Sequence, residues 1–139
     1  IATPHQGSPV ADWAISNTQK IGVFQMLKWS SMDTQAFLDL TTAECAAFNE
    51  KTPDVPTVKY FSVAGEQKRE LTVSALRMCH DIVTKAEGPN DGLVSSQSAR
   101  WGEETIIWSA DHAQQIGWFN DPSFDWRNGW REILNRIRE

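Results

Sequence analysis

Two short segments rich in β-branched and aromatic residues, Thr57–Ala64 and Thr105–Trp108, flank a stretch of helical periodicity at residues 71–84. Strands that alternate with helices in this way predict a fold of the α/β class. Asp91 lies in the Gly-bounded turn that follows this helical stretch, and His112 comes shortly after the second segment. In open α/β sheets, functional side chains gather beyond the carboxyl ends of the strands. We therefore expect Asp91 and His112 to lie close together at one edge of the sheet.

Asp91 and His112 are residue types that cooperate in proton transfer. An aspartate held in a turn can accept a hydrogen bond from a histidine ring, fix its tautomer and stabilise the imidazolium that forms during acyl transfer. Each residue also has an ordinary explanation. Asn90-Asp91-Gly92 is a common turn sequence in which the carboxylate bonds nearby backbone, and a lone histidine after a strand more commonly makes a structural hydrogen bond.

Three other titratable residues are weaker candidates. Asp111 adjoins His112, but neighbouring side chains of an extended backbone point to opposite faces, so Asp111 ranks second to Asp91 as the partner of the ring. His5 is interpreted as a structural residue of its turn. His80 is interpreted as structural too, because it lies in the helical stretch beside Asp81, where a solvated or capping role is sufficient.

A serine nucleophile is the missing part of such a site. In α/β-hydrolases it occupies a G-x-S-x-G elbow, and no such motif occurs in residues 1–139. The segment Thr3-Pro4-His5-Gln6-Gly7-Ser8 resembles the T-P-H-x-G-S sequence that follows this elbow in bacterial and fungal triacylglycerol lipases. Leu40–Asn49, Val58–Gly65 and the N-D-G-L-V-S and D-H elements are also similar to that family, in the same order. The resemblance identifies residues 1–139 as the C-terminal portion of a single α/β-hydrolase domain.

This resemblance implies a carboxylic ester hydrolase of the lipase type, which acts on acylglycerols or related esters through a Ser-Asp-His triad. Asp91 and His112 would come from this chain. The serine and the oxyanion hole would come from a companion N-terminal segment or a second chain. The alternative is a lipase-derived binding or structural protein that retains the half-fold without catalysis.

Residues 12–52 correspond in position to the helical lid or cap of lipases. The resemblance implies that four apolar residues of this region line an acyl site, namely Phe24, Met26, Leu27 and Trp29. Periodicity alone favours a plain pair of core helices. Within the region, Thr41-x-x-Glu44 is a capping box that predicts the start of a short helix, which must end before Pro53.

Composition excludes several classes of partner. The net charge is −5 and there is no cluster of lysine and arginine, which argues against nucleic acid. No apolar run approaches the roughly 20 residues that span a bilayer, so membrane contact would be interfacial at most. Cys45 and Cys79 lack C-x-x-C spacing, which argues against a zinc site. They could form one disulfide in a secreted enzyme, but buried free thiols are equally ordinary.

We expect neither a cofactor nor a metal. In bacterial relatives the histidine motif commonly reads D-H-L-D, and its second aspartate helps to bind Ca²⁺. Here Gln114 occupies that position, and a neutral amide is a weaker ligand than a carboxylate. We expect the loop that carries His112, called the histidine loop below, to be supported instead by Ile116, Trp118 and Phe119. These residues would pack against a closing helix that begins after Asp125.

Overall fold

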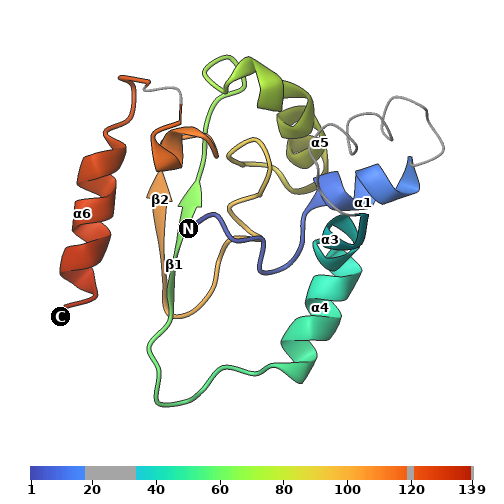
Figure 1. The fold of residues 1–139 in the computed structure, drawn as a ribbon, viewed down its shortest axis with the longest axis horizontal. Helices are drawn as coiled ribbons and strands as arrows, with labels where there is room; N and C mark the ends of the chain where they lie inside the picture. The colour runs from blue at the N-terminus through green and yellow to red at the C-terminus, as the bar shows by residue number, and fades with distance from the viewer. Residues whose placement is uncertain (18–33, 119–120, 139) are drawn as a thin grey trace.

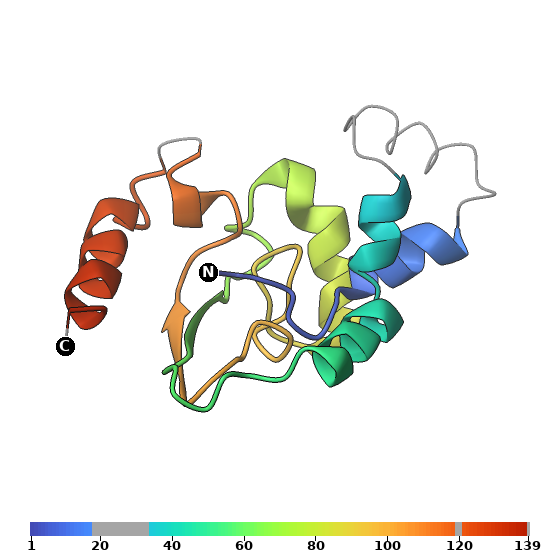
Figure 2. The same ribbon diagram turned by 60° about the horizontal axis from the view of Figure 1, so that its bottom comes forward.

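The computed structural model describes residues 1–17, 34–118 and 121–138. Within these residues, a two-stranded parallel sheet lies between one helix on one side and the remaining helices on the other (Figure 1 and Figure 2). The strands are β1 (Phe61–Gly65) and β2 (Glu104–Trp108), and the helices are α1 (Pro9–Ser16), α3 (Thr34–Asp39), α4 (Thr42–Lys51), α5 (Arg77–Glu87) and α6 (Trp126–Arg136). The expected α/β arrangement is present.

The two strands pair in register from Phe61 opposite Glu104 to Gly65 opposite Trp108. Side chains alternate between the faces of a strand, and successive residues of β1 accordingly belong to different cores. Val63 packs with Trp108 and with Ile133 of α6, whereas Ala64 packs with residues of the loop that follows α5. The sheet is therefore covered on both faces. β1 begins at Phe61, later than the predicted start at Thr57.

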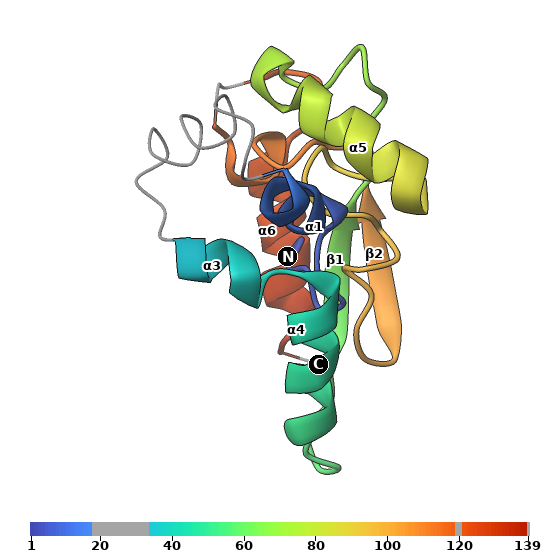
Figure 3. The ribbon, with the colours of Figure 1, turned by 90° about the vertical axis from the view of Figure 1, so that its right-hand side faces the viewer.

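The α1 helix packs against α3, α4 and α5 (Figure 3). The Ser8 side chain caps its N-terminus, and Pro9 occupies the first turn, where its missing N–H costs nothing. Val10 packs against α5, and Ala11 packs against α3. The carboxylate of Asp12 accepts hydrogen bonds from the backbone nitrogen and the hydroxyl of Thr42, at 3.0 and 2.9 Å, and so ties α1 to the start of α4.

The predicted helix start at Thr41 is confirmed, because the Thr41 side chain accepts a hydrogen bond from the backbone nitrogen of Glu44. The reciprocal half of the predicted capping box is not formed, since the Thr41 backbone nitrogen donates to the Leu38 carbonyl oxygen at 3.0 Å. The predicted start of α5 is wrong. A 3-10 turn at Ser74–Leu76 precedes it, and the backbone nitrogen of Val73 donates to the carboxylate of Asp111 at 2.8 Å. This long-range bond fixes the chain in a turn where periodicity predicts helix.

The α6 helix begins after Asp125, whose carboxylate accepts a hydrogen bond from the backbone nitrogen of Asn128. Ile133 is the large apolar residue of α6 that the sheet buries. Leu134 and Ile137, further along the chain, are exposed. No helix among residues 1–17, 34–118 and 121–138 is both long and apolar enough to cross a bilayer.

Candidate active site

The turn that carries Asp91 places a fully buried carboxylate next to the end of β1. One of its oxygens, Oδ1, accepts hydrogen bonds from the backbone nitrogens of Leu93 and Val94, at 3.0 and 2.8 Å. Asn90 closes the turn, because its side-chain oxygen accepts from the nitrogen of Gly92 at 2.8 Å. Gly92 has a φ of +101°, a conformation that favours glycine. Residues of the same turn therefore hold Oδ1 of Asp91 in place.

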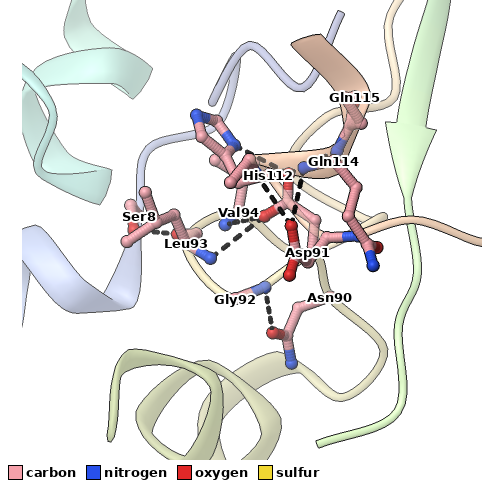
Figure 4. Close-up of polar contacts among 11 residues, drawn as sticks. Ser8, Asn90, Asp91, Gly92, Leu93, Val94, His112, Gln114 and Gln115 are labelled. Carbon is pink, nitrogen blue, oxygen red and sulfur yellow. Dashed lines mark hydrogen bonds and ion pairs between the residues drawn. The ribbon is translucent and has the colours of Figure 1, made fainter. Parts of the chain in front are cut away.

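His112 meets this carboxylate from the loop that follows β2 (Figure 4). Its Nδ1 atom lies 2.8 Å from Oδ2 of Asp91, and its backbone nitrogen donates to the Asp91 carbonyl oxygen at 2.8 Å. The carboxylate is completely buried, whereas the histidine side chain remains 38% exposed. The two residues expected to work together thus do lie together, and the ring remains accessible to a reacting group.

Burial and charge act in opposite directions on the pKa of His112. Burial alone would lower the pKa, because it disfavours the charged imidazolium. The hydrogen bond and the negative charge of Asp91, together with the charge of Asp111, outweigh this effect and raise the pKa above its ordinary value. The site therefore stabilises the protonated His112 ring. A group that accepts a proton during a reaction needs this stabilisation.

Gln115 is a member of the site that reasoning from the sequence missed. Its side-chain nitrogen donates to Oδ2 of Asp91 at 2.9 Å, so that this oxygen accepts from both Gln115 and His112 (Figure 4). Gly65 makes room for it, since a Cβ atom there would lie 2.3 Å from the Gln115 nitrogen. The only signal in the sequence is the spacing of three residues from His112, which places two side chains on one side of a 3-10 turn.

Asp111 has a structural role and does not contact the His112 ring. Its Oδ1 atom accepts hydrogen bonds from the backbone nitrogens of Ala113 and Gln114, at 2.9 and 2.8 Å. Its other oxygen accepts from Val73. This arrangement supports the ranking of Asp91 ahead of Asp111.

The other two histidines lie outside this pair. The His5 ring stacks on Trp101, with 5.1 Å between the ring centroids, in agreement with a structural role. His80 also agrees with a structural role, but it is neither solvated nor a helix cap, contrary to the expectation from its helical position. It is buried, with Nε2 2.9 Å from the Gln67 carbonyl oxygen and Nδ1 3.2 Å from the Thr84 hydroxyl.

The histidine loop is supported differently from the sequence-based expectation. Ile116 and Trp118 are both exposed, and Phe119 lies outside the described residues. A buried side chain, that of Gln114, holds the loop instead. Its oxygen accepts from the backbone nitrogen of Asp111 at 2.7 Å, and its nitrogen donates to the Asp121 carboxylate at 2.7 Å.

An apolar cavity of about 380 Å³ opens beside His112. Its walls come from three helices and the Asp91 turn, and they include Val10, Ala11, Phe37, Leu76, Cys79, Leu93 and Val94. The residues expected to line an acyl site, Phe24, Met26, Leu27 and Trp29, lie outside the described residues. The cavity wall that the structure does describe is therefore made of residues that the sequence analysis did not assign to it.

Cys45 and Cys79 are free thiols, and burial raises the pKa of both. Across residues 1–17, 34–118 and 121–138, no three histidine, cysteine, aspartate or glutamate side chains cluster in a way that could hold a metal ion.

Comparison with known proteins gives this site a context. No protein-family profile matches the chain. Its sequence is 31% identical to triacylglycerol lipase 2 of Saccharomyces cerevisiae over 133 residues, which are 94% of this chain and 40% of the yeast protein. The fold is similar to that of a Bacillus licheniformis lipase in its mature form, with a TM-score of 0.62 and 28% identity over 80% of this chain and 45% of that one.

The fold is also similar to that of a metagenomic carboxyl esterase, with a TM-score of 0.63 and 30% identity over 80% of this chain and 35% of that one. The chain thus spans less than half the length of each of these proteins. The resemblance to lipases that the sequence indicates is confirmed, since the chain is similar over most of its length to parts of lipases and of a carboxyl esterase.

Proposed function

We propose that this chain supplies the aspartate and the histidine of a Ser-Asp-His triad to a carboxylic ester hydrolase of the lipase type. The observation that carries the proposal is the Asp91–His112 pair at the wall of an apolar cavity. An apolar cavity next to a general base suits an ester with a hydrocarbon acyl chain. Acylglycerols and related esters are substrates of this kind. This choice of substrate is supported by the names of two similar proteins, a triacylglycerol lipase and a bacterial lipase.

The chemistry assigned to His112 follows from its tautomer. A carboxylate only accepts hydrogen bonds, so Nδ1 of His112 carries the proton that faces Asp91. The Nε2 atom is then the nitrogen that takes the proton of the nucleophile. It later delivers this proton to the leaving alcohol, while Asp91 stabilises the intermediate imidazolium.

We assign the acyl chain of the substrate to the 380 Å³ cavity. Phe37 of α3 and Leu40, which follows α3, lie on its walls, so this part of residues 12–52 forms part of its boundary. A lid or cap role for that region is part of the proposal. Phe24, Met26, Leu27 and Trp29 are assigned to the same acyl site on the basis of the family resemblance alone.

The nucleophile is assigned to a companion segment or a second chain, because the 139 residues contain no G-x-S-x-G elbow. The oxyanion hole is assigned to the same companion. A His-Asp pair without a nucleophile offers no covalent route, so we expect the pure 139-residue chain to be inactive towards p-nitrophenyl esters. A turnover that depends on both Asp91 and His112 in the pure chain would contradict this assignment.

The test of function uses the native protein, isolated with whatever copurifies with it. Treatment with a fluorophosphonate, which reacts with activated serines, is followed by intact-mass and peptide analysis. We expect one labelled serine in a G-x-S-x-G sequence, and its labelling should be lost in His112→Gln. The matched control is Asp81→Asn, which alters an exposed ion pair with Arg69 and should label normally.

Absence of labelling and of ester hydrolysis in the native protein would refute the proposed function. The other candidate is a binding or structural protein derived from a lipase, and this outcome would favour it. Retention of fatty-acid binding in the cavity without any labelled serine would identify that case.

A further inference from the structure

Gln115 has an unusual set of contacts for a buried amide. The residue is 1% exposed, and its nitrogen donates to the same Asp91 oxygen that faces His112. We propose that Gln115 is a positioning residue of the Asp91–His112 pair, which fixes the shared carboxylate oxygen and partly neutralises its charge. The role in hydrolysis rests on the proposed function, whereas the effect on the pair itself does not.

The orientation of the Gln115 amide follows from the chemistry of its partner. A carboxylate is an acceptor, so the amide must present its nitrogen to Asp91 rather than its oxygen. With this bond the carboxylate has two donors on each oxygen. Oδ1 accepts from Leu93 and Val94, and Oδ2 accepts from His112 and Gln115. Rotation of the carboxylate in either direction would break at least one of these bonds.

The surroundings indicate that Gln115 is kept for this contact. Its side-chain oxygen is buried with no hydrogen-bond partner among the described residues. Buried polar atoms are rarely left unpaired, and a site role is one of the recognised reasons. The Gln115 backbone oxygen accepts a hydrogen bond from the Trp130 ring nitrogen of α6 at 3.0 Å. The backbone of Gln115 is therefore held from the helix side, and Gly65 leaves the space that the Gln115 side chain fills.

Partial neutralisation of Asp91 has a measurable consequence for His112. The charges that act on the ring are the carboxylates of Asp91 and Asp111, which raise its pKa, and the chain N-terminus, which lowers it. Gln115 withdraws part of the Asp91 charge through its hydrogen bond. Loss of the amide would leave the imidazolium as the one remaining donor to Oδ2 among the described residues, so the ring would interact with a larger share of the Asp91 charge. Oδ1 would stay fixed by its two backbone donors. The pKa of His112 should then rise.

The experiment compares Gln115→Met with Gln114→Met in the full chain. Methionine retains the length of the side chain and removes the amide. Gln114 is also buried in the same loop and bonds Asp111 and Asp121 rather than Asp91, so its variant controls for loosening of the loop. The pKa of His112 is measured by NMR titration of its ring, assigned with His112→Gln. We expect a rise of roughly half a unit or more in Gln115→Met and a clearly smaller change in Gln114→Met.

A measurement on the unmodified chain covers the case in which a variant does not fold. Because Gln115 and His112 share one oxygen, the side-chain amide resonances of Gln115 should titrate with the midpoint of His112, and those of Gln114 should follow it much less. An unchanged or lowered pKa in Gln115→Met overturns the proposal. Equal shifts of the His112 pKa in the two variants also overturn it. So do Gln115 amide resonances that do not change as His112 titrates.

The same variants separate this inference from the proposed function. In the native protein, the acidic limb of the pH profile of kcat/KM should move upward in Gln115→Met by the shift seen in the His112 titration. If the titration shifts but the native protein hydrolyses no ester, the proposed function fails and the positioning of the pair stands.

Discussion

Asp91 and His112 are joined twice, through the side-chain bond of 2.8 Å and through a backbone bond of 2.8 Å from the His112 nitrogen to the Asp91 carbonyl oxygen. The second bond does not depend on the charge of either side chain. The main chain thus holds the two loops together, and the chemistry of the carboxylate can be changed without separating them.

Substitution Asp91→Asn tests whether the backbone bond and the charge of the side chain act separately. The backbone bond remains, so we expect the variant to fold, but the negative charge that raises the pKa of His112 is lost and the pKa should fall. In the native protein, kcat should decrease by about four orders of magnitude, as when the aspartate of a serine-protease triad is replaced by asparagine. NMR titration and steady-state kinetics measure the two effects. A pKa of His112 that does not fall would contradict the assignment.

Gly65→Ala should disturb the site from the end of β1. The added Cβ atom would lie 2.3 Å from the Gln115 nitrogen and 2.8 Å from Cβ of Asp91, so these side chains must move. We expect a loss of about 1–3 kcal/mol in the free energy of unfolding together with a changed pKa of His112.

The control for Gly65→Ala is Gly88→Ala. Gly88 has a φ of +91°, which is strained for alanine, and a Cβ atom there meets no atom within 4 Å. This variant should also lose about 1–3 kcal/mol, from backbone strain, but its His112 titration should match the unmodified chain. Denaturant unfolding and NMR titration of His112 are measured for both variants. If His112 titrates identically in Gly65→Ala and Gly88→Ala, Gly65 has no role in the site.

The raised pKa of His112 predicts how stability depends on pH. A group that is more basic in the folded state binds protons more tightly there, so its stabilising contribution is complete below its unfolded pKa of about 6.5. The contribution is lost as the pH rises through the higher folded pKa. The difference in free energy of unfolding between the unmodified chain and His112→Gln should therefore shrink as the pH is raised above about 6.5. A difference that grows over this range would mean that the pKa is lowered.

The sequence predicts the pair at the centre of the site for a clear physical reason. Asp91 is oriented by its own turn, and His112 follows a strand whose end is marked by composition, so both signals are local. Gln115 could not be predicted in the same way, because its contact with Asp91 depends on the space left by Gly65. The start of α5 was missed for a similar reason, since the bond from Val73 to Asp111 joins residues far apart in the sequence.

The last prediction concerns the histidine loop and metal. The side chain of Gln114 joins the backbone nitrogen of Asp111 to the carboxylate of Asp121 and also accepts from the Gln67 amide at 3.1 Å, so it connects three segments through direct hydrogen bonds. We expect the melting temperature to be the same with a chelator as with millimolar calcium. Gln114→Leu should lower the free energy of unfolding by about 1–3 kcal/mol, because it leaves the buried Asp111 nitrogen without a partner. A melting temperature that falls when the chelator is added would show instead that the loop depends on an ion.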